Sequence, residues 1–509
     1  MKHQLLSLLL LAGCVACGAS DEASPPTGES SAVTQGGPQD IGQFRAVVDA
    51  GDVPSVALLD EVGFFAEHAL DLPAADCGGS VCPHGMLAVA PRFNETNWTM
   101  AFVALNSAVQ ASDLATKPRH LIWVVENSPR TVNWLRNSSI IDTLIAALGP
   151  DDRASVVTLT NPSEVIADAA TATELVQLQQ QGTFAFTSYP FANVDLFAGL
   201  ARTLSLTQSE KVTDLQQSVA LFSSGMTDSG VTEITHFTDL AREFATRGVV
   251  LSSFGLGDQY QRAIPMTLAE VGSGNYYYAA DPSDLEQAVE VEAATAFAPI
   301  ARTMRLSVAP EAGYHVGRVY GARTVTYDGA DVVIETPTLF LGSRSGSQDT
   351  EMGRRGGGGG IFVQLVADEE NARAGQADAF RMTLSYNDVL QGDAQEFSRT
   401  WATPLGIGMN PPPDAPYFSD VPRAKPFMML NMYLALYAMI ELYEAGDCGG
   451  AQGIRDMMFQ SYTYWSEIYD DPDIDADYEL ITELAQNISN FCNAPVSPRP
   501  QADVSCFMF

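Results

Sequence analysis

A short polar turn follows an apolar run and places three reactive side chains close together. Leu121–Val125 is apolar and rich in β-branched residues, and Glu126, Ser128 and Arg130 follow it directly. The run predicts a strand buried on both faces, and the helical pattern after the turn predicts a strand–turn–helix unit. Open α/β sheets carry their sites at the carboxyl ends of strands, so we expect this turn to belong to a site.

Patterns that would indicate catalysis are missing from the chain. The six histidines are scattered, and the sequence contains no HExxH zinc motif and no GxSxG nucleophile turn. Gly255 and Gly257 alone are too weak a pattern to predict a dinucleotide site. We therefore expect no cofactor and no small-molecule substrate, and a binding or assembly protein rather than an enzyme. The alternatives are a hydrolase with an unrecognised site and a purely structural component.

The stretch Asp470–Glu479 alternates carboxylates in the manner of a calcium loop. Ala476 stands where an EF-hand needs glycine, and Glu483 is out of step for the last ligand. Acidic residues also complement the N-terminus of a helix. A solvated helix start is the preferred interpretation of this stretch, and a calcium site is the alternative.

A glycine run and a methionine-rich stretch each allow a functional and a structural interpretation. Gly356–Gly360 lacks the Gly-Lys-Ser/Thr ending of a phosphate loop and precedes a strand, so we predict a mobile loop. The methionines of 427–443 recur at helical spacing, which favours a packed core over a ligand groove.

The cysteines suit an oxidising compartment. Cys77 and Cys82 bracket a flexible loop and are predicted to form a small disulfide. Cys448 and Cys492 flank helical segments and form the preferred second pair, with Cys492–Cys506 as the rival. No second Cys or His pair completes a metal site, so we expect no metal there.

Length and charge set limits on the class of protein. The chain has 509 residues and a formal net charge of −35, with 46% hydrophobic residues. Such a length predicts two to four domains. The acidic balance disfavours nucleic acid and anionic lipid as electrostatic partners.

The N-terminus has the features of a secretory signal. A basic start and an apolar segment end in Leu11-Ala12-Gly13-Cys14, which resembles a bacterial lipoprotein box. We expect residues 1–13 to be a signal peptide, Cys14 to carry a lipid, and residues 14–42 to be a flexible tether. Val15 resembles the outer-membrane sorting pattern, so the expected location is the outer membrane of the cell envelope. An ordinary cleaved signal is the alternative.

Strand and helix patterns alternate between residues 119 and 298, which predicts a doubly wound, mostly parallel α/β sheet. This segment resembles a von Willebrand factor type A (VWA) domain. The resemblance rests on the strand and turn ending in ENSPR, the VDLFAGL helix start, the LFSSGMTDSG strand end and GVVLSSFGLGDQY. Residues before it, including Gly51–Pro54 and Ala90–Asn94, resemble the N-terminal segment of a bacterial secreted VWA family.

The resemblance implies a divalent-cation site that this chain has altered. Five positions align with the ligands, and they carry Glu126, Ser128, Arg130, Val194 and Ser224. Only one carboxylate and one hydroxyl remain from the family's set. A charge pair at contact is worth about 4 kcal/mol at an effective dielectric of 20, so Arg130 opposes a metal and favours Glu126. We hypothesise that the guanidinium stands in the cation's place; a cation-dependent adhesion protein is the alternative.

The remaining chain divides into three parts. Residues 43–118 are expected to form a small helical unit plus a strand at Trp98–Leu105, and residues 299–402 a β-sandwich-like domain. A lone strand cannot leave its backbone unpaired, so we expect Trp98–Leu105 to pair with the later strands. Residues 403–509 are predicted to be a helical C-terminal region.

The expected function is lipid-anchored, metal-independent protein binding in the cell envelope. The expected contact surface is the end of the sheet that carries Arg130, with Tyr189, Phe191 and Met226 at its rim. These residue types suit protein contacts. Arg130 either captures an acidic partner residue or is consumed internally by Glu126.

Overall fold

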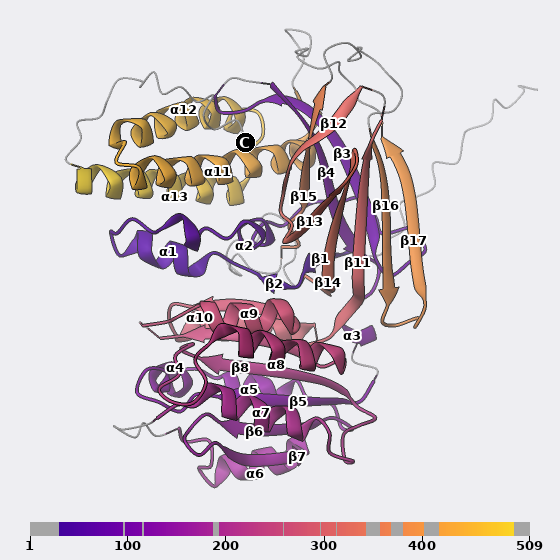
Figure 1. Cartoon of the computed structure of the whole chain (residues 1–509), viewed down its shortest axis with the longest axis vertical. Helices are drawn as coiled ribbons and strands as arrows, with labels where there is room; N and C mark the ends of the chain where they lie inside the picture. Colours follow the sequence, from indigo (N-terminus) through magenta and orange to yellow (C-terminus); the bar gives the residue numbers. More distant parts are fainter. Residues whose placement is uncertain are drawn as a thin grey trace, which may run out of the picture.

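The computed structural model describes residues 30–94, 97–114, 117–186, 193–257, 259–295, 297–311, 313–342, 357–367, 380–401 and 417–492. An α/β unit, a β unit and a layer of helices make up these residues (Figure 1). The predicted fold class is therefore confirmed: a mostly parallel α/β sheet with an attached β-sandwich-like domain and a C-terminal helical region.

The α/β unit alternates strands and helices along the chain. Its elements are β5 (Arg119–Val125), α4 (Val132–Asn137), α5 (Ile140–Ala146), β6 (Arg153–Thr158), β7 (Glu164–Ala170), α6 (Ala172–Gln180), α7 (Leu196–Leu206), β8 (Gln216–Ser223), α8 (Ile234–Thr246), β9 (Val250–Leu256), α9 (Ala263–Val271), β10 (Ser273–Ala279) and α10 (Pro282–Ala294). The strand order is β10-β9-β8-β5-β6-β7, with only the β6–β7 pair of these antiparallel.

Strand β5 lies inside this sheet, between β8 and β6, and is buried on both faces. Alternate side chains enter two different cores: Trp123 packs with α4, α5 and α10, while Ile122 and Val124 pack with α7 and α8. This period of two explains why the strand appears in the sequence as a continuous apolar run. The parallel neighbours β5 and β8 bring the turns after them to one end of the sheet.

The β unit is assembled from both sides of the α/β unit. Its strands are β1 (Ser31–Gln35), β3 (Cys82–Pro91), β4 (Asn97–Ser107), β11 (Pro299–Pro310), β12 (Tyr314–Tyr320), β13 (Thr324–Asp328), β14 (Asp331–Leu341), β15 (Ile361–Ala367), β16 (Phe380–Asp388) and β17 (Ala394–Trp401). Strand β4 pairs with β15, with Phe102 opposite Phe362. The expected pairing of the lone strand with later strands is thus present, and the α/β unit is an insertion between β4 and β11.

The predicted tether is too long, because residues from Ser31 onward are part of the fold. Strand β1 pairs with β4 and β14, and β2 (Gly37–Pro38) adds a parallel strand to β10. The buried Gln39 amide donates to the carbonyls of Gln35 and Gly37, at 2.7 and 2.9 Å. The strand pairings are long-range, so the local composition of Ser, Gly and Pro could not indicate them.

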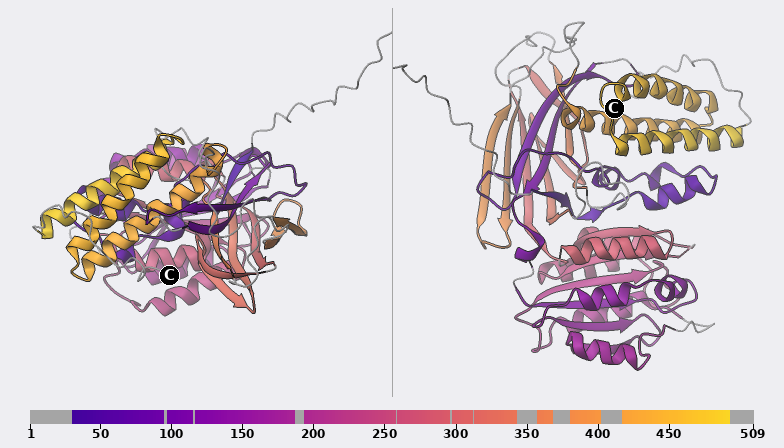
Figure 2. Two further views of the ribbon diagram at one scale, coloured as in Figure 1. Left: turned by 90° about the horizontal axis from the view of Figure 1, so that it is seen from above. Right: turned by 180° about the vertical axis from the view of Figure 1, so that it is seen from behind.

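Helices complete the molecule on one side of the β unit. They are α1 (Gly42–Asp49), the short 3₁₀ helix η1 (Val56–Leu58), α2 (Glu61–Ala66), α11 (Val421–Glu444), α12 (Cys448–Ser466) and α13 (Pro472–Cys492), with the small α3 (Ala111–Leu114) near the insertion. Figures 1 and 2 show α1 and α2 between the C-terminal helices and the α/β unit. No helix within the described ranges is long and apolar enough to cross a membrane.

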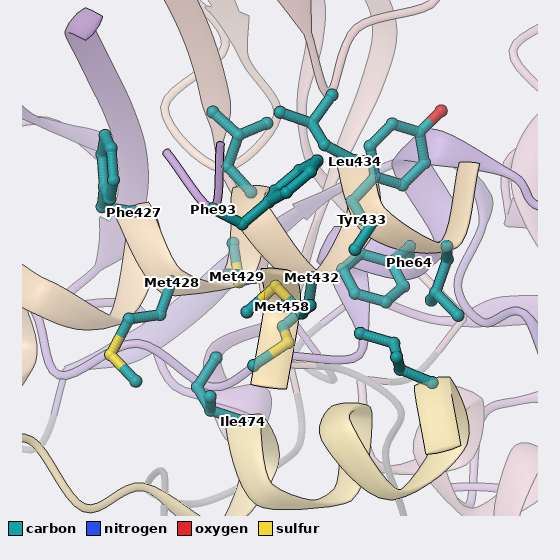
Figure 3. Close-up of a cluster of buried hydrophobic side chains, with 14 of the residues drawn as sticks. Phe64, Phe93, Phe427, Met428, Met429, Met432, Tyr433, Leu434, Met458 and Ile474 are labelled. Atoms are coloured by element: carbon teal, nitrogen blue, oxygen red, sulfur yellow. The ribbon is translucent and has the colours of Figure 1, made fainter. Parts of the chain in front are cut away.

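The methionine-rich stretch is a packed core, as its helical spacing predicts. Met428, Met429, Met432 and Met439 are buried in one cluster that also contains Phe64 (Figure 3). Both predicted disulfides are present: Cys77–Cys82, and Cys448–Cys492, which joins the start of α12 to the end of α13. The rival partner Cys506 lies outside the described residues.

The described part of the glycine run is packed rather than mobile. The Gly357 N–H donates to the Ala66 carbonyl at 2.9 Å, and Gly358 pairs with Ala69. A Cβ at Gly357 would lie 2.3 Å from the backbone of His68, so only glycine permits this approach to α2. The prediction of a mobile loop is therefore wrong for Gly357–Gly360.

Candidate functional site

The carboxylate of Glu126 is the centre of a buried polar cluster at the end of β5. Glu126 is fully buried, and its backbone N–H donates to the Phe222 carbonyl of β8 at 2.8 Å. The Ser128 hydroxyl donates to Glu126 Oε1 at 2.6 Å. The Glu126 carboxylate thus faces the end of β8 instead of solvent, because the backbone bond to Phe222 holds the turn against that strand.

The end of β8 supplies further donors to the same carboxylate. The Ser223 hydroxyl and the Ser224 backbone N–H donate to Glu126 Oε2 at 2.8 and 2.7 Å. The Ser224 hydroxyl lies 2.9 Å from Oε2 and 3.0 Å from Oε1. Ser128 and Ser224 thus lie at the same end of the sheet, as their alignment with one set of ligand positions implies. Ser223 was not singled out in the sequence, since a strand-terminal serine has no distinctive pattern.

Arg130 spans the cluster from its buried centre to its surface. Its Nε donates to Glu126 Oε1 and to Ser224 Oγ, both at 3.1 Å. Its two terminal nitrogens donate to the two oxygens of Asp228, at 2.9 and 3.0 Å. The side chain is 20% exposed, whereas Glu126 is not exposed at all. Arg130 is therefore engaged internally, by a second carboxylate as well as by Glu126.

Asp228 joins a third loop to the site and was missed in the sequence. Its carboxylate accepts from the Val194 backbone N–H at 3.0 Å, and its own N–H donates to the Val194 carbonyl at 2.8 Å. Val194 itself is buried and offers only its backbone here. The acidic residue in LFSSGMTDSG, four positions after Ser224, was the available indication, but only the return of the loop brings it to Arg130.

The ion pair between Arg130 and Asp228 shifts the pKa values of the two groups in opposite directions. The bidentate hydrogen bond from Arg130 is the main cause that lowers the pKa of Asp228, although partial burial opposes it. The same bond raises the pKa of Arg130. Both groups are therefore held in their charged forms near neutral pH.

The residues at this site do not fit a divalent cation. The guanidinium Nε lies at hydrogen-bond distance from both Glu126 Oε1 and Ser224 Oγ, which are the oxygens that would have to face the ion. A permanent cation at that distance repels a second one. The hydrophobic side chain at Val194 also offers no oxygen ligand.

The remaining predicted rim residues fall in different places. Met226 follows β8 on the same loop as Asp228 and is partly exposed. Tyr189 and Phe191 lie outside the described residues. Arg130, Met226 and Asp228 together form a surface that we call the upper face.

The acidic stretch at the start of α13 is bound internally instead of solvated. Lys425 of α11 is buried, and its Nζ lies 3.0 Å from Asp471 and 2.7 Å from Asp473. Asp477 is buried and lies 2.7 Å from His68 Nε2. The prediction of a solvated helix start is wrong for these three carboxylates. Within the described residues, no group of acidic, His or Cys side chains is arranged to hold a metal.

Comparisons with known proteins bear on the fold alone. No protein-family model and no curated protein matches the sequence. A solved von Willebrand factor type A protein from Catenulispora acidiphila matches 81% of this chain and 96% of its own, at 13% identity and a TM-score of 0.45. The ArnB paralog VWA2 from Sulfolobus acidocaldarius matches 81% of this chain and 98% of its own, at 16% identity and a TM-score of 0.37. BatB from Bacteroides thetaiotaomicron covers 35% of this chain and 98% of its own, at 11% identity and a TM-score of 0.29.

Proposed function

We propose that this chain is a protein-binding component of the bacterial cell envelope, anchored by a lipid on Cys14. Its contact surface is the upper face of the VWA-like unit, and binding there needs no metal. The supporting observation is the guanidinium of Arg130, which bonds to Glu126, Ser224 and Asp228 and so joins the ends of β5 and β8 to the loop before α7.

The upper face combines side-chain types that suit a protein contact. Met226 offers an adaptable apolar side chain beside the partly exposed Arg130–Asp228 pair. Arginine and methionine are enriched at protein interfaces. The internal pairing keeps Arg130 in one orientation, which lowers the entropy that a partner must offset on binding.

The anchor is tested by comparing two neighbouring cysteines. We expect Cys14→Ser to release the chain from the membrane fraction, whereas Cys17→Ser leaves it there. The lipid adds about 0.8 kcal/mol of membrane affinity per buried CH₂, so its loss removes the attachment. Equal membrane retention of the two variants would contradict an anchor at Cys14.

The contact surface is tested by cross-linking the full-length chain in its envelope and measuring recovery of one identified cross-linked protein. We expect Met226→Arg to reduce that recovery about tenfold, the effect of a 1.4 kcal/mol loss in a modest interface contact. Glu210→Arg, an exposed change after the opposite end of α7, serves as the control. Unchanged recovery with Met226→Arg would show that the upper face is not the contact surface.

Metal independence has its own measurement. We expect an excess of EDTA to leave recovery of the cross-linked protein unchanged, because Arg130 supplies the positive charge at the site. Loss of the complex with EDTA and its return with Mg²⁺ would instead support the cation-dependent alternative.

A further inference from the structure

A cavity of about 500 Å³ lies where the β unit meets the start of α11. None of its lining residues belongs to the α/β unit, so the cavity is separate from the upper face. The apolar part of its wall is formed by Leu72, Met86, Phe102, Pro422 and Pro426. Small-molecule sites have volumes of roughly 300–1,000 Å³, are mostly apolar and occur between domains.

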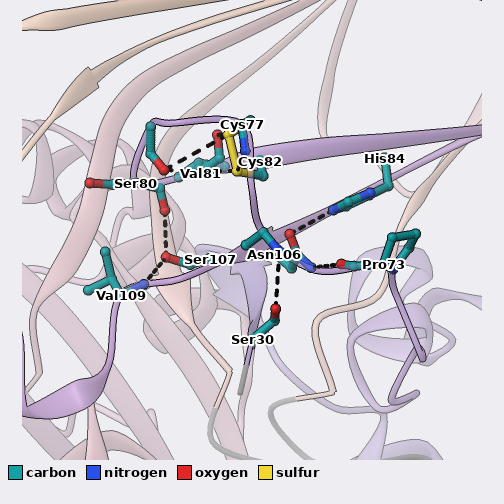
Figure 4. Close-up of a disulfide and its surroundings, with 12 residues drawn as sticks. Ser30, Pro73, Cys77, Ser80, Val81, Cys82, His84, Asn106, Ser107 and Val109 are labelled. Carbon is teal, nitrogen blue, oxygen red and sulfur yellow. Dashed lines mark hydrogen bonds between the residues drawn. A yellow bond between two sulfur atoms is a disulfide. The ribbon is translucent and has the colours of Figure 1, made fainter. Parts of the chain in front are cut away.

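His84 gives the wall a defined polar group. Its Nε2 lies 2.7 Å from the side-chain oxygen of Asn106, whose amide nitrogen donates to the Pro73 carbonyl at 2.7 Å (Figure 4). Asn106 therefore accepts from His84, which places the imidazole proton on Nε2 and leaves Nδ1 as an acceptor. Burial lowers the pKa of His84, so the ring is neutral at pH 7.

Arg399 gives the cavity wall a positive charge, and Asp71, which also lines the cavity, gives it a negative one. The Arg399 guanidinium lies 5.3 Å from the ring centre of Trp401 and forms no ion pair within the described ranges. Trp401 in turn lies against Gly85, where an added Cβ would be 2.4 Å from the indole. The other lining arginine, Arg423, is already paired with Asp420.

We propose that this cavity binds a small carboxylate with an apolar body. The apolar wall would bury the body, and Arg399 at β17 would pair with the carboxylate. Arginine is suited to this role because its planar N–H groups match both carboxylate oxygens. The accepting Nδ1 of His84 would favour ligands that also carry a hydroxyl.

Calorimetric titration with octanoate tests this site. The full chain carries Cys14→Ser, so that no detergent competes for the cavity. We expect one octanoate per chain, with 1-octanol bound about tenfold more weakly, a difference of about 1.4 kcal/mol. Octylamine should bind less tightly than octanoate, because Arg399 would repel its ammonium. Tighter binding of octylamine than of octanoate would instead assign the polar end of the ligand to Asp71. Absence of saturable octanoate binding, or equal affinity for octanoate and 1-octanol, would overturn the proposal.

Substitutions then place the ligand. We expect Arg399→Gln to remove the preference for octanoate over 1-octanol while leaving 1-octanol binding intact. The control Arg381→Gln changes an exposed arginine on the adjacent β16, which pairs with Glu311, and should keep the preference. Equal loss of preference in both variants would mean that net charge, not this cavity, selects the anion.

Filling the cavity gives an independent readout. We expect Met86→Trp and Leu72→Trp each to abolish binding of both octanoate and 1-octanol, since the indole occupies the space of the ligand body. Melting temperature and circular dichroism identify a variant that has failed to fold. Wild-type octanoate affinity in both folded variants would place the ligand elsewhere and refute the site.

Discussion

At the scale of single residues, Arg130 acts as a bridge between a buried and an exposed carboxylate. Glu126 has no solvent contact and depends on Arg130 Nε and on hydroxyl and backbone donors. We expect Arg130→Ala to destabilise the chain by about 2 kcal/mol, less than the 3–5 kcal/mol typical of a broken buried pair, because the serine donors remain. Urea unfolding measures the change.

A matched arginine separates this effect from the general loss of positive charge. Arg242 on α8 pairs with Asp239, and both side chains are well exposed. Its replacement by alanine should change stability by less than about 0.5 kcal/mol. A similar cost for both variants would mean that Glu126 does not depend on Arg130.

Glu292 carries a protonation-dependent contribution to stability. Burial raises the pKa of this α10 carboxyl to about 7, although hydrogen bonds from Asn275, Ser252 and Tyr277 oppose the shift. The unfolded chain loses this proton near pH 4.3, so the stabilising contribution is complete below that pH and is lost as pH rises through 7. We expect wild type to lose on the order of 2 kcal/mol more than Glu292→Gln between pH 5 and pH 8.

The same helix provides the control for this pH dependence. Glu290 is exposed two residues earlier, and Glu290→Gln should follow the wild-type profile. Denaturant unfolding at the two pH values gives the comparison. Parallel profiles for wild type and Glu292→Gln would show that the buried carboxyl does not titrate in this window.

At the scale of elements, the N-terminal strands connect the two sheets. Strand β1 belongs to the β unit and β2 to the α/β unit, with the buried Gln39 directly after them. Deleting residues 1–40 removes both pairings and exposes the edge of β10. We expect faster hydrogen exchange in β10 and β14 and a lower melting temperature.

A shorter deletion isolates the contribution of these strands. Removing residues 1–29 takes away the predicted signal peptide and most of the predicted tether but retains β1 and β2. This variant should melt as the full chain does, because no described pairing is lost. If both deletions melted alike, β1 and β2 would not connect the sheets.

At the scale of the whole molecule, a buried ionic contact joins the N-terminal and C-terminal helices. Asp477 of α13 lies 2.7 Å from His68 Nε2 and 3.5 Å from the Arg45 guanidinium of α1. Removing one member of such a group leaves the others buried and unpaired. We expect Asp477→Ala to cost about 3 kcal/mol and to increase proteolysis between the two helical segments.

The exposed Glu479 on the same helix is the matched control. Glu479→Ala should keep the free energy of unfolding within about 0.5 kcal/mol of wild type, as for other surface positions. It should also leave the proteolytic pattern unchanged. If Asp477→Ala behaved in the same way, the contact would not hold the two segments together.

The sequence by itself determined the elements whose patterns are local. Continuous apolar strands such as Leu121–Val125, and the helices that alternate with them, have periods that the backbone geometry requires. The cysteine pairs preferred from the sequence, Cys77–Cys82 and Cys448–Cys492, are the two that form, although the sequence left Cys492–Cys506 open as a rival. The expected meeting of the turn after β5 with the end of β8 followed from the parallel order of a doubly wound sheet.

Only the tertiary structure decided the contacts between distant segments. The incorporation of Ser31–Pro38 into two sheets, the packing of Gly357–Gly360 on α2 and the pairing of Arg130 with Asp228 each depend on chain returns. Asp471 and Asp473 likewise resemble a solvated helix start in the sequence, but in the fold both are paired with Lys425 of another helix. Polar and glycine residues can be stable either in water or beside a buried partner, and composition does not distinguish these environments. Apolar periodicity does distinguish them, because a regularly spaced apolar face is stable only when it is buried.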